Sequence, residues 1–123
     1  MTSYYWRKII PDLAERFTVV APDLRGCGDS DRPTSGYDKC TVAEDIHHLV
    51  QHLKLGPINL ISHDVGMMVA YAYASRYASE VRRLVLTEAA LAGWVWRSCS
   101  TRPRTHACFT CRCLARRTGW RKH

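Results

Sequence analysis

The residues most able to do chemistry form the pentapeptide Ser62-His63-Asp64-Val65-Gly66, which lies between an apolar β-branched run and an apolar helical run. Small residues two positions before and two after the centre of such a segment are typical of a sharp strand-to-helix turn, because the flanking residues nearly touch there. The turn holds its central residue in a strained conformation at the carboxyl end of the strand, where open α/β sheets bind ligands. Asp64 is therefore a candidate nucleophile.

A carboxylate at this turn can attack an electrophilic carbon and form an ester, which water must then hydrolyse. The backbone N–H of Val65, at the start of the following helix, is predicted to stabilise charge on the ester oxygen as one half of an oxyanion hole. The alternative is that Asp64 only caps this helix, since aspartate is a favoured N-cap residue. The pentapeptide in isolation favours the cap, so the surrounding sequence decides between the two interpretations.

Three strands and three helices are expected to position this turn, and they alternate along the chain. A strand is predicted at Phe17–Ala21, because this run is short, apolar and rich in β-branched residues. Ile58–Ser62 is predicted as a second buried strand, and residues 82–89 as a third. Helices are predicted over residues 5–17, from Thr41 to before Gly56, and over residues 67–77. Such alternation predicts a parallel sheet with right-handed crossovers.

The predicted helix from Thr41 is the clearest of these elements. Thr41 and Glu44 form a capping-box pattern at its start, and an apolar stripe from Val42 to Leu53 gives it a buried face. Its polar face carries His47, His48, Gln51 and His52. We interpret His48 and His52 as solvated side chains rather than as a metal-binding pair.

Residues 23–33, 62–77 and 80–89 together resemble the α/β-hydrolase superfamily, in its epoxide hydrolase and dehalogenase branch, and the resemblance covers Trp6 to Gly93. The match to the D-x-R-G-x-G-x-S loop after that family's fourth strand is made by Asp23, Arg25, Gly26, Gly28 and Ser30. His63, Asp64 and Gly66 match the family's G-H-D-x-G elbow, and Ser62 replaces its first glycine. This context favours the nucleophile over the cap.

The resemblance implies an alkyl-enzyme ester mechanism on a small-molecule substrate, without cofactor or metal. Asp64 would attack an epoxide or carbon–halogen bond, and a distant histidine would activate water. Many epoxide hydrolases and haloalkane dehalogenases have tryptophan directly after the nucleophile, and haloacetate dehalogenases often have arginine. Val65 offers no side-chain donor for a halide, so we favour an epoxide hydrolase-like enzyme.

The resemblance is partial, and the fold class expected is a fragment of the α/β-hydrolase fold with an incomplete sheet. The family's His-Gly oxyanion loop would precede Trp6, and its cap, acid and catalytic histidine would follow Gly93, but none of these patterns is found. The absent strand would pair with both Phe17–Ala21 and Ile58–Ser62. We therefore expect a truncated, inactive chain of marginal stability, which a cooperative melt followed by circular dichroism would contradict.

Composition divides the chain at about Gly93, into a partial hydrolase core over residues 1–93 and a basic, cysteine-rich, irregular tail over residues 94–123. The core has ten Lys/Arg and eleven Asp/Glu, net −1, whereas the tail has eight Lys/Arg and no acid, net +8. Charge of this kind could attract nucleic acid, and Cys and His at short spacings could hold zinc. The zinc candidates are His106, Cys108, Cys111 and Cys113.

A third interpretation of the tail is a shifted reading frame, because acids vanish where the family pattern stops, and we prefer it. The competing function is a non-enzymatic small protein whose tail binds zinc or nucleic acid. No apolar run reaches the length of about 18 residues needed to span a membrane, and the N-terminus lacks a signal pattern. We therefore expect a cytoplasmic chain without a membrane partner; oligomeric state is left open.

Overall fold

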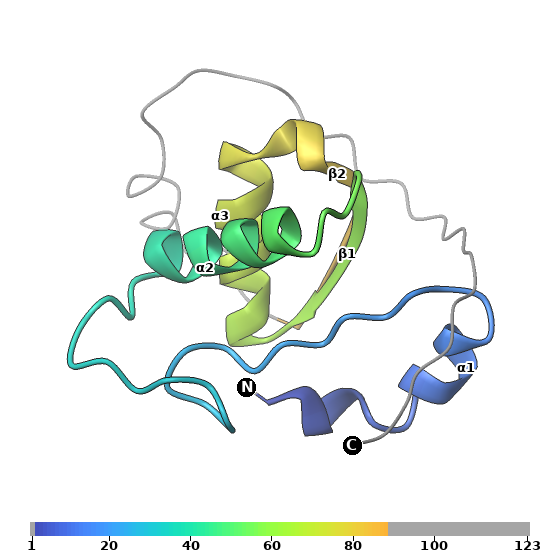
Figure 1. The fold of residues 1–123 in the computed structure, drawn as a ribbon, viewed down its shortest axis with the longest axis horizontal. Coiled ribbons are helices and arrows are strands. Elements are labelled where there is room, and N and C mark those ends of the chain that lie inside the picture. The colour runs from blue at the N-terminus through green and yellow to red at the C-terminus, as the bar shows by residue number, and fades with distance from the viewer. Residues whose placement is uncertain (1, 89–123) are drawn as a thin grey trace. The chain divides into compact units, whose positions relative to one another are not determined.

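A computed structural model of the chain describes residues 2–88 (Figure 1). The predicted tail, with its zinc candidates, lies outside the described residues. The predicted boundary at Gly93 lies outside them as well. The described residues fall into two compact units, 2–34 and 35–88. The second unit contains Ser62 to Gly66.

The second unit is built on two parallel strands, β1 (Ile58–His63) and β2 (Val81–Thr87). Their register pairs His63 with Thr87 at the carboxyl edge, and an irregularity follows Ile58 at the other end. Helix α3 (Val65–Arg76) and the short 3-10 turn η2 (Ala78–Glu80) connect them. The predicted fold class is confirmed as parallel strands alternating with helices in an incomplete sheet.

Helix α3 is at the centre of this unit, because it contacts both strands, η2 and helix α2 (Lys39–His52) (Figure 1). Its buried residues are Met67, Val69, Ala70, Ala72 and Tyr73. Val42, Ala43 and Val50 are the buried residues of α2. The helix predicted over residues 67–77 is confirmed as a helix, with bounds of Val65–Arg76. Five of its twelve residues are buried, so it is covered on one face and not enclosed all round.

Helix α2 begins earlier than predicted. Asp38, not Thr41, is its N-cap: the Asp38 carboxylate accepts hydrogen bonds from the Thr41 N–H at 3.0 Å and the Thr41 hydroxyl at 2.5 Å. Thr41 therefore sits at the third helical position, and the predicted capping box with Glu44 is wrong. These hydrogen bonds from the side chain and backbone of Thr41 lower the pKa of Asp38.

The first unit carries a 3-10 turn, η1 (Ser3–Trp6), and a short helix, α1 (Ile10–Ala14), in place of one helix over residues 5–17. Pro11 lies in the first turn of α1, where its missing N–H costs nothing. The predicted strand Phe17–Ala21 is wrong, because these residues form no ladder within the described part of the chain. Strand structure needs paired backbone groups, and an apolar sequence alone does not supply them.

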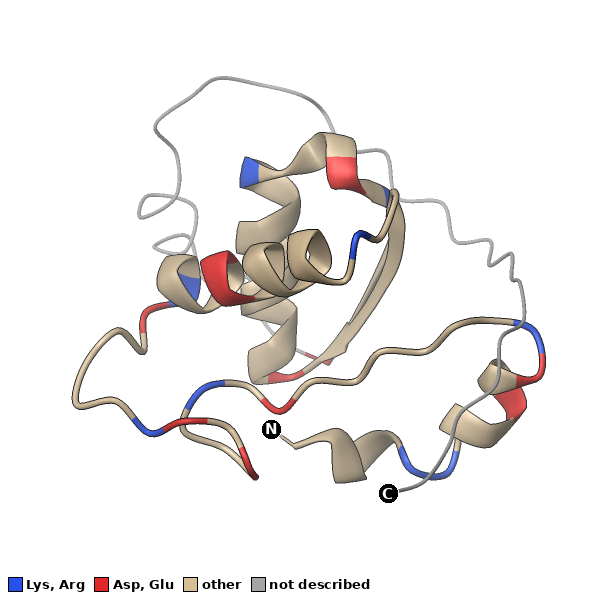
Figure 2. Cartoon of the chain, viewed as in Figure 1, with Lys and Arg blue, Asp and Glu red and all other residues tan. Residues whose placement is uncertain are grey.

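Charges of both signs are scattered through both units, as Figure 2 shows. This agrees with the balance counted for the first 93 residues, so the excess positive charge belongs to the tail sequence. Between residues 2 and 88, no helix is long and apolar enough to cross a membrane.

Candidate active site

The turn between β1 and α3 has a strained backbone at Asp64, with φ of 50° and ψ of −127°. A positive φ is uncommon outside glycine, and its cost is about 1–3 kcal/mol, borne only where the surroundings impose it. The Asp64 side chain is exposed and makes no capping hydrogen bond to α3. Asp64 therefore occupies the N-cap position of α3 without the side-chain hydrogen bond that a capping role would supply.

The residues flanking Asp64 explain why the chain can turn so sharply. Ser62 is buried at 6% exposure, and its hydroxyl donates a 3.2 Å hydrogen bond to the Val85 carbonyl of β2. Gly66 is the second residue of α3 and adds no side chain to the inside of the turn. The N–H of Met67 donates to the Asp64 carbonyl at 2.9 Å, which starts the helix directly after the turn.

Val65 is the first residue of α3 and is 39% exposed. The first N–H groups of a helix have no carbonyl partner within that helix, and they point toward its N-terminal end. The Val65 N–H thus belongs to the end of α3 that adjoins Asp64, which suits it to stabilise a developing negative charge.

Thr87, the last residue of β2, makes the contacts that join the turn to the neighbouring strand. Its carbonyl accepts a 3.1 Å hydrogen bond from the Asp64 N–H, and its hydroxyl donates to the Ser62 carbonyl at 3.0 Å. The His63 ring lies with Nδ1 3.2 Å from the same hydroxyl. Thr87 was not predicted from the sequence, although its register opposite His63 follows once β1 and β2 are aligned.

Glu88 is a second carboxylate beside this turn that the sequence analysis missed. It comes one residue after β2, as Asp64 comes one residue after β1, and it too has a positive φ, of 52°. Its carboxylate lies 3.7 Å from Nε2 of His63 and is mostly exposed. The signal was available in the sequence, because an acid follows the end of each of two adjacent parallel strands.

The loop that matches D-x-R-G-x-G-x-S belongs to the first unit. Hydrogen bonds to Asp23 hold it together. The Asp23 carboxylate accepts hydrogen bonds from the backbone N–H of Ser3 at 2.5 Å and of Asp29 at 3.1 Å, and these lower its pKa. Its carbonyl accepts from the Ser30 hydroxyl at 2.7 Å. Asp23 and Ser30 therefore hold the loop together, and neither is positioned to act on a substrate by these contacts.

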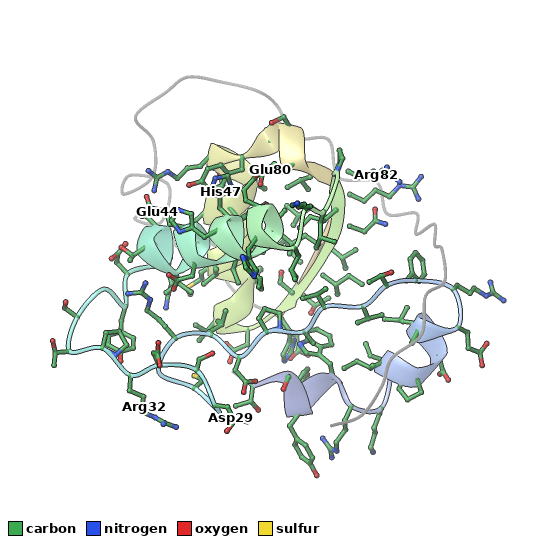
Figure 3. All side chains as sticks on the ribbon, in the orientation of Figure 1. Asp29, Arg32, Glu44, His47, Glu80 and Arg82 are labelled. Atoms are coloured by element: carbon green, nitrogen blue, oxygen red, sulfur yellow. The ribbon has the colours of Figure 1, made fainter. Side chains whose placement is uncertain are left out.

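Two glycines of the loop have positive φ, of 79° at Gly26 and 53° at Gly28. A Cβ at Gly28 would overlap the Asp23 carboxylate, so only glycine fits there. Arg25, between them and Asp23, is half-buried. Asp29 and Arg32 point outward from the loop in Figure 3, and the Arg32 guanidinium donates to the Gly28 carbonyl at 2.8 Å.

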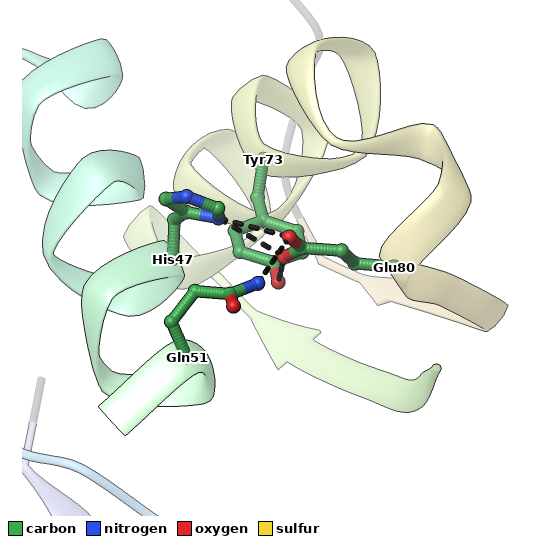
Figure 4. Close-up of polar contacts among 4 residues, drawn as sticks. All are labelled: His47, Gln51, Tyr73 and Glu80. Atoms are coloured by element: carbon green, nitrogen blue, oxygen red, sulfur yellow. Dashed lines mark hydrogen bonds and ion pairs between the residues drawn. The ribbon is translucent and has the colours of Figure 1, made fainter. Parts of the chain in front are cut away.

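A second polar cluster, away from the turn, joins α2, α3 and η2 around Glu80 (Figures 3 and 4). The carboxylate accepts hydrogen bonds from the Tyr73 hydroxyl at 2.5 Å and the Gln51 amide at 2.8 Å, and Nδ1 of His47 lies 3.1 Å away. The His47 ring stacks on Tyr77 with centroids 4.0 Å apart. Burial opposes ionisation of Glu80, but these hydrogen bonds outweigh it and lower its pKa.

Comparison with known proteins decides the family. Residues 1–102 match the family model of the alpha/beta hydrolase fold. The chain belongs to the α/β-hydrolase fold family. This α/β-hydrolase chain is 48% identical, over 85 residues, to the soluble epoxide hydrolase of Corynebacterium sp. (strain C12), a match over 69% of its own length and 30% of that protein's.

Other relatives place the chain among enzymes of varied chemistry. It is 34% identical over 96 residues to the cis-3-alkyl-4-alkyloxetan-2-one decarboxylase of Xanthomonas campestris pv. campestris, covering 71% of this chain and 32% of that protein. The structure of an epoxide hydrolase without ligand superposes with a TM-score of 0.69 at 48% identity, over 70% of this chain and 30% of that one. The chain thus spans about a third of the length of these relatives.

The site residues predicted from the sequence divide into two sets. Ser62, His63, Asp64, Val65 and Gly66 come together in one turn of the second unit. The loop residues Asp23, Gly28 and Ser30 come together in the first unit. No group of three His, Cys, Asp or Glu side chains that could hold a metal ion is found in residues 2–88.

Proposed function

We propose that this chain is an Asp-nucleophile α/β-hydrolase of the epoxide hydrolase type, acting through an alkyl-enzyme ester on Asp64. The supporting observation is the conformation of Asp64. Its backbone is strained, and its exposed side chain makes no capping hydrogen bond, as suits a nucleophile at the end of a strand. The Asp64 carboxylate would form a bond to an epoxide carbon while the ring C–O bond breaks, and the released alkoxide would take a proton from solvent.

Hydrolysis of the ester requires a base to activate water, and we propose that the chain alone stops at the ester. Of the histidines in residues 2–88, His47 is engaged with Glu80 and His63 with Thr87, while His48 and His52 are exposed on α2. None of these contacts directs an imidazole toward Asp64. The Val65 N–H would stabilise the oxyanion of the second step, but it cannot replace the base.

Mass spectrometry tests both steps. The full chain is incubated with styrene oxide and digested, and the peptide containing Asp64 is expected to gain the mass of one intact epoxide. Asp64→Asn should remove the adduct, and the exposed carboxylate of Asp12 on α1 serves as an internal reference that stays unmodified.

Incubation in ¹⁸O-labelled water then reports turnover, since hydrolysis at the ester carbonyl would place label in the Asp64 carboxylate. We expect a stable ester and no label. An adduct that persists in Asp64→Asn would overturn the nucleophile assignment, and label entering Asp64 would overturn the claim that the chain stops at the ester.

A further inference from the structure

Thr87 contacts three successive residues of the turn, although it belongs to the neighbouring strand. Its carbonyl receives the Asp64 N–H at 3.1 Å, while its hydroxyl lies 3.0 Å from the Ser62 carbonyl and 3.2 Å from His63 Nδ1. A substitution of Thr87 can remove the hydroxyl but not the carbonyl, because every residue has the carbonyl.

The direction of these hydrogen bonds follows from proton counting. A hydroxyl has one proton, and the Ser62 carbonyl can only accept, so the Thr87 hydroxyl donates to Ser62. It must then accept from His63, so Nδ1 of that ring carries a proton. Nε2 of His63 lies 3.7 Å from the Glu88 carboxylate. The imidazole is held by β2 and the residue after it.

A strained conformation persists only where surrounding contacts over-determine it. The chain after Asp64 is held by helix α3, which begins with the Met67 N–H donating to the Asp64 carbonyl. The chain before Asp64 consists of the Ser62–His63 peptide and the His63 ring, and Thr87 contacts both. Loss of the hydroxyl would remove one donor to the part-buried Ser62 carbonyl and the contact that β2 makes with the His63 ring.

We propose that Thr87 is a positioning residue for the nucleophile, whose hydroxyl fixes the Ser62–His63 peptide and the His63 ring and thereby sets the direction of the Asp64 carboxylate. The proposal rests on the proposed function of Asp64 and deepens it. Because small displacements of reacting groups change rates by one to two orders of magnitude, we expect Thr87→Val to slow adduct formation on Asp64 about tenfold. Thr87→Ser, which keeps the hydroxyl, should recover the rate to within about threefold.

The test combines the adduct rate with a spectroscopic readout on the full chain. The Cα and Cβ chemical shifts of Asp64 report its positive φ, and exchange of its amide proton reports the hydrogen bond to Thr87. Both should change in Thr87→Val and return in Thr87→Ser. Thr41→Val is the matched control, since it removes a threonine hydroxyl hydrogen bond at the start of α2. It should lower stability without changing the adduct rate or the shifts of Asp64.

Two outcomes separate this proposal from the proposed function. If the unsubstituted chain forms no adduct, the nucleophile assignment fails, and the chemical shifts of Asp64 still decide the positioning role. Shifts and amide exchange that are the same in Thr87→Val as in the unsubstituted chain would overturn the positioning role even if Asp64 is alkylated. An equal loss of rate in Thr41→Val and Thr87→Val would also overturn it, because a general loss of stability would then explain both.

Discussion

The Tyr73 hydroxyl on α3 donates a 2.5 Å hydrogen bond to the Glu80 carboxylate in η2. Tyr73 is fully buried, and its phenol pKa is raised by burial and by the adjacent carboxylate. The same carboxylate is bonded to Gln51 of α2, so one acidic side chain joins both helices to the start of β2 (Figure 4). This cluster helps to fix the layer of helices against which the sheet packs.

Removing either partner of this pair should destabilise the fold. Tyr73→Phe leaves the Glu80 carboxylate short of one donor, and we expect a loss of about 1–2 kcal/mol in the free energy of unfolding. Glu80→Gln should cost a similar amount, and the double variant should lose less than the sum, because the two residues act on one hydrogen bond. Urea denaturation measures these values.

Tyr4→Phe is the matched control for these variants, because Tyr4 is 67% exposed and its ring contact with Arg7 is kept. Its effect should stay within about 0.5 kcal/mol. Strict additivity of Tyr73→Phe and Glu80→Gln would contradict a direct interaction between the two side chains.

The lowered pKa of Glu80 predicts a dependence of stability on pH. The ionised carboxylate stabilises the folded chain fully above the pKa of about 4.5 expected in the unfolded chain. This contribution is lost as the pH falls through the lower pKa of the folded state, because protonation then removes the acceptor. The urea concentration at the unfolding midpoint should therefore decrease as the pH is lowered from about 5. This decrease should be less steep in Glu80→Gln. Parallel curves for the two chains would contradict this assignment.

The strands at 58–63 and 81–87 could be predicted from sequence because the information is local. Each contains an apolar stretch with β-branched residues of the kind that a covered parallel sheet requires, and each is followed directly by a residue with positive φ. Phe17–Ala21 has the same local character but no ladder, since pairing depends on a neighbouring strand that composition does not specify. The elbow was predictable for a related reason, as small residues at fixed spacing are required by the turn itself.

The cap of α2 and the Glu80 cluster could not be predicted in the same way. Asp38 and Thr41 are both good cap residues three positions apart, and only the backbone conformation decides between them. Two partners of Glu80, Gln51 and His47, come from 29 and 33 positions earlier in the chain. Such contacts depend on the packing of α2 against α3, so His47 and Gln51 looked like any other residues on a polar helix face.

Gly28 offers a test of the loop in the first unit. Gly28→Ala would bring a Cβ into the Asp23 carboxylate at a backbone φ that disfavours alanine, so we expect the loop to open. Arg25, followed by Gly26, provides a tryptic site within the loop, and cleavage there should become several-fold faster. Gly56→Ala is the control, because a Cβ at Gly56 meets no atom within 4 Å. Equal cleavage rates in the two variants would argue against the clash.

The strain at Asp64 predicts an unusual order of stability among variants at this position. Alanine must adopt the same positive φ as Asp64, whereas glycine does so freely, and the exposed side chain contributes no capping hydrogen bond that either would lose. Asp64→Gly should therefore be more stable than Asp64→Ala by about 1 kcal/mol in urea denaturation. Asp45, inside α2, is the control. There the alanine variant should be more stable than the glycine variant by about 1 kcal/mol in the free energy of unfolding, since helical backbone favours alanine. The same order at both positions would mean that the backbone at Asp64 relaxes without cost, which would remove the main support for its role as a nucleophile.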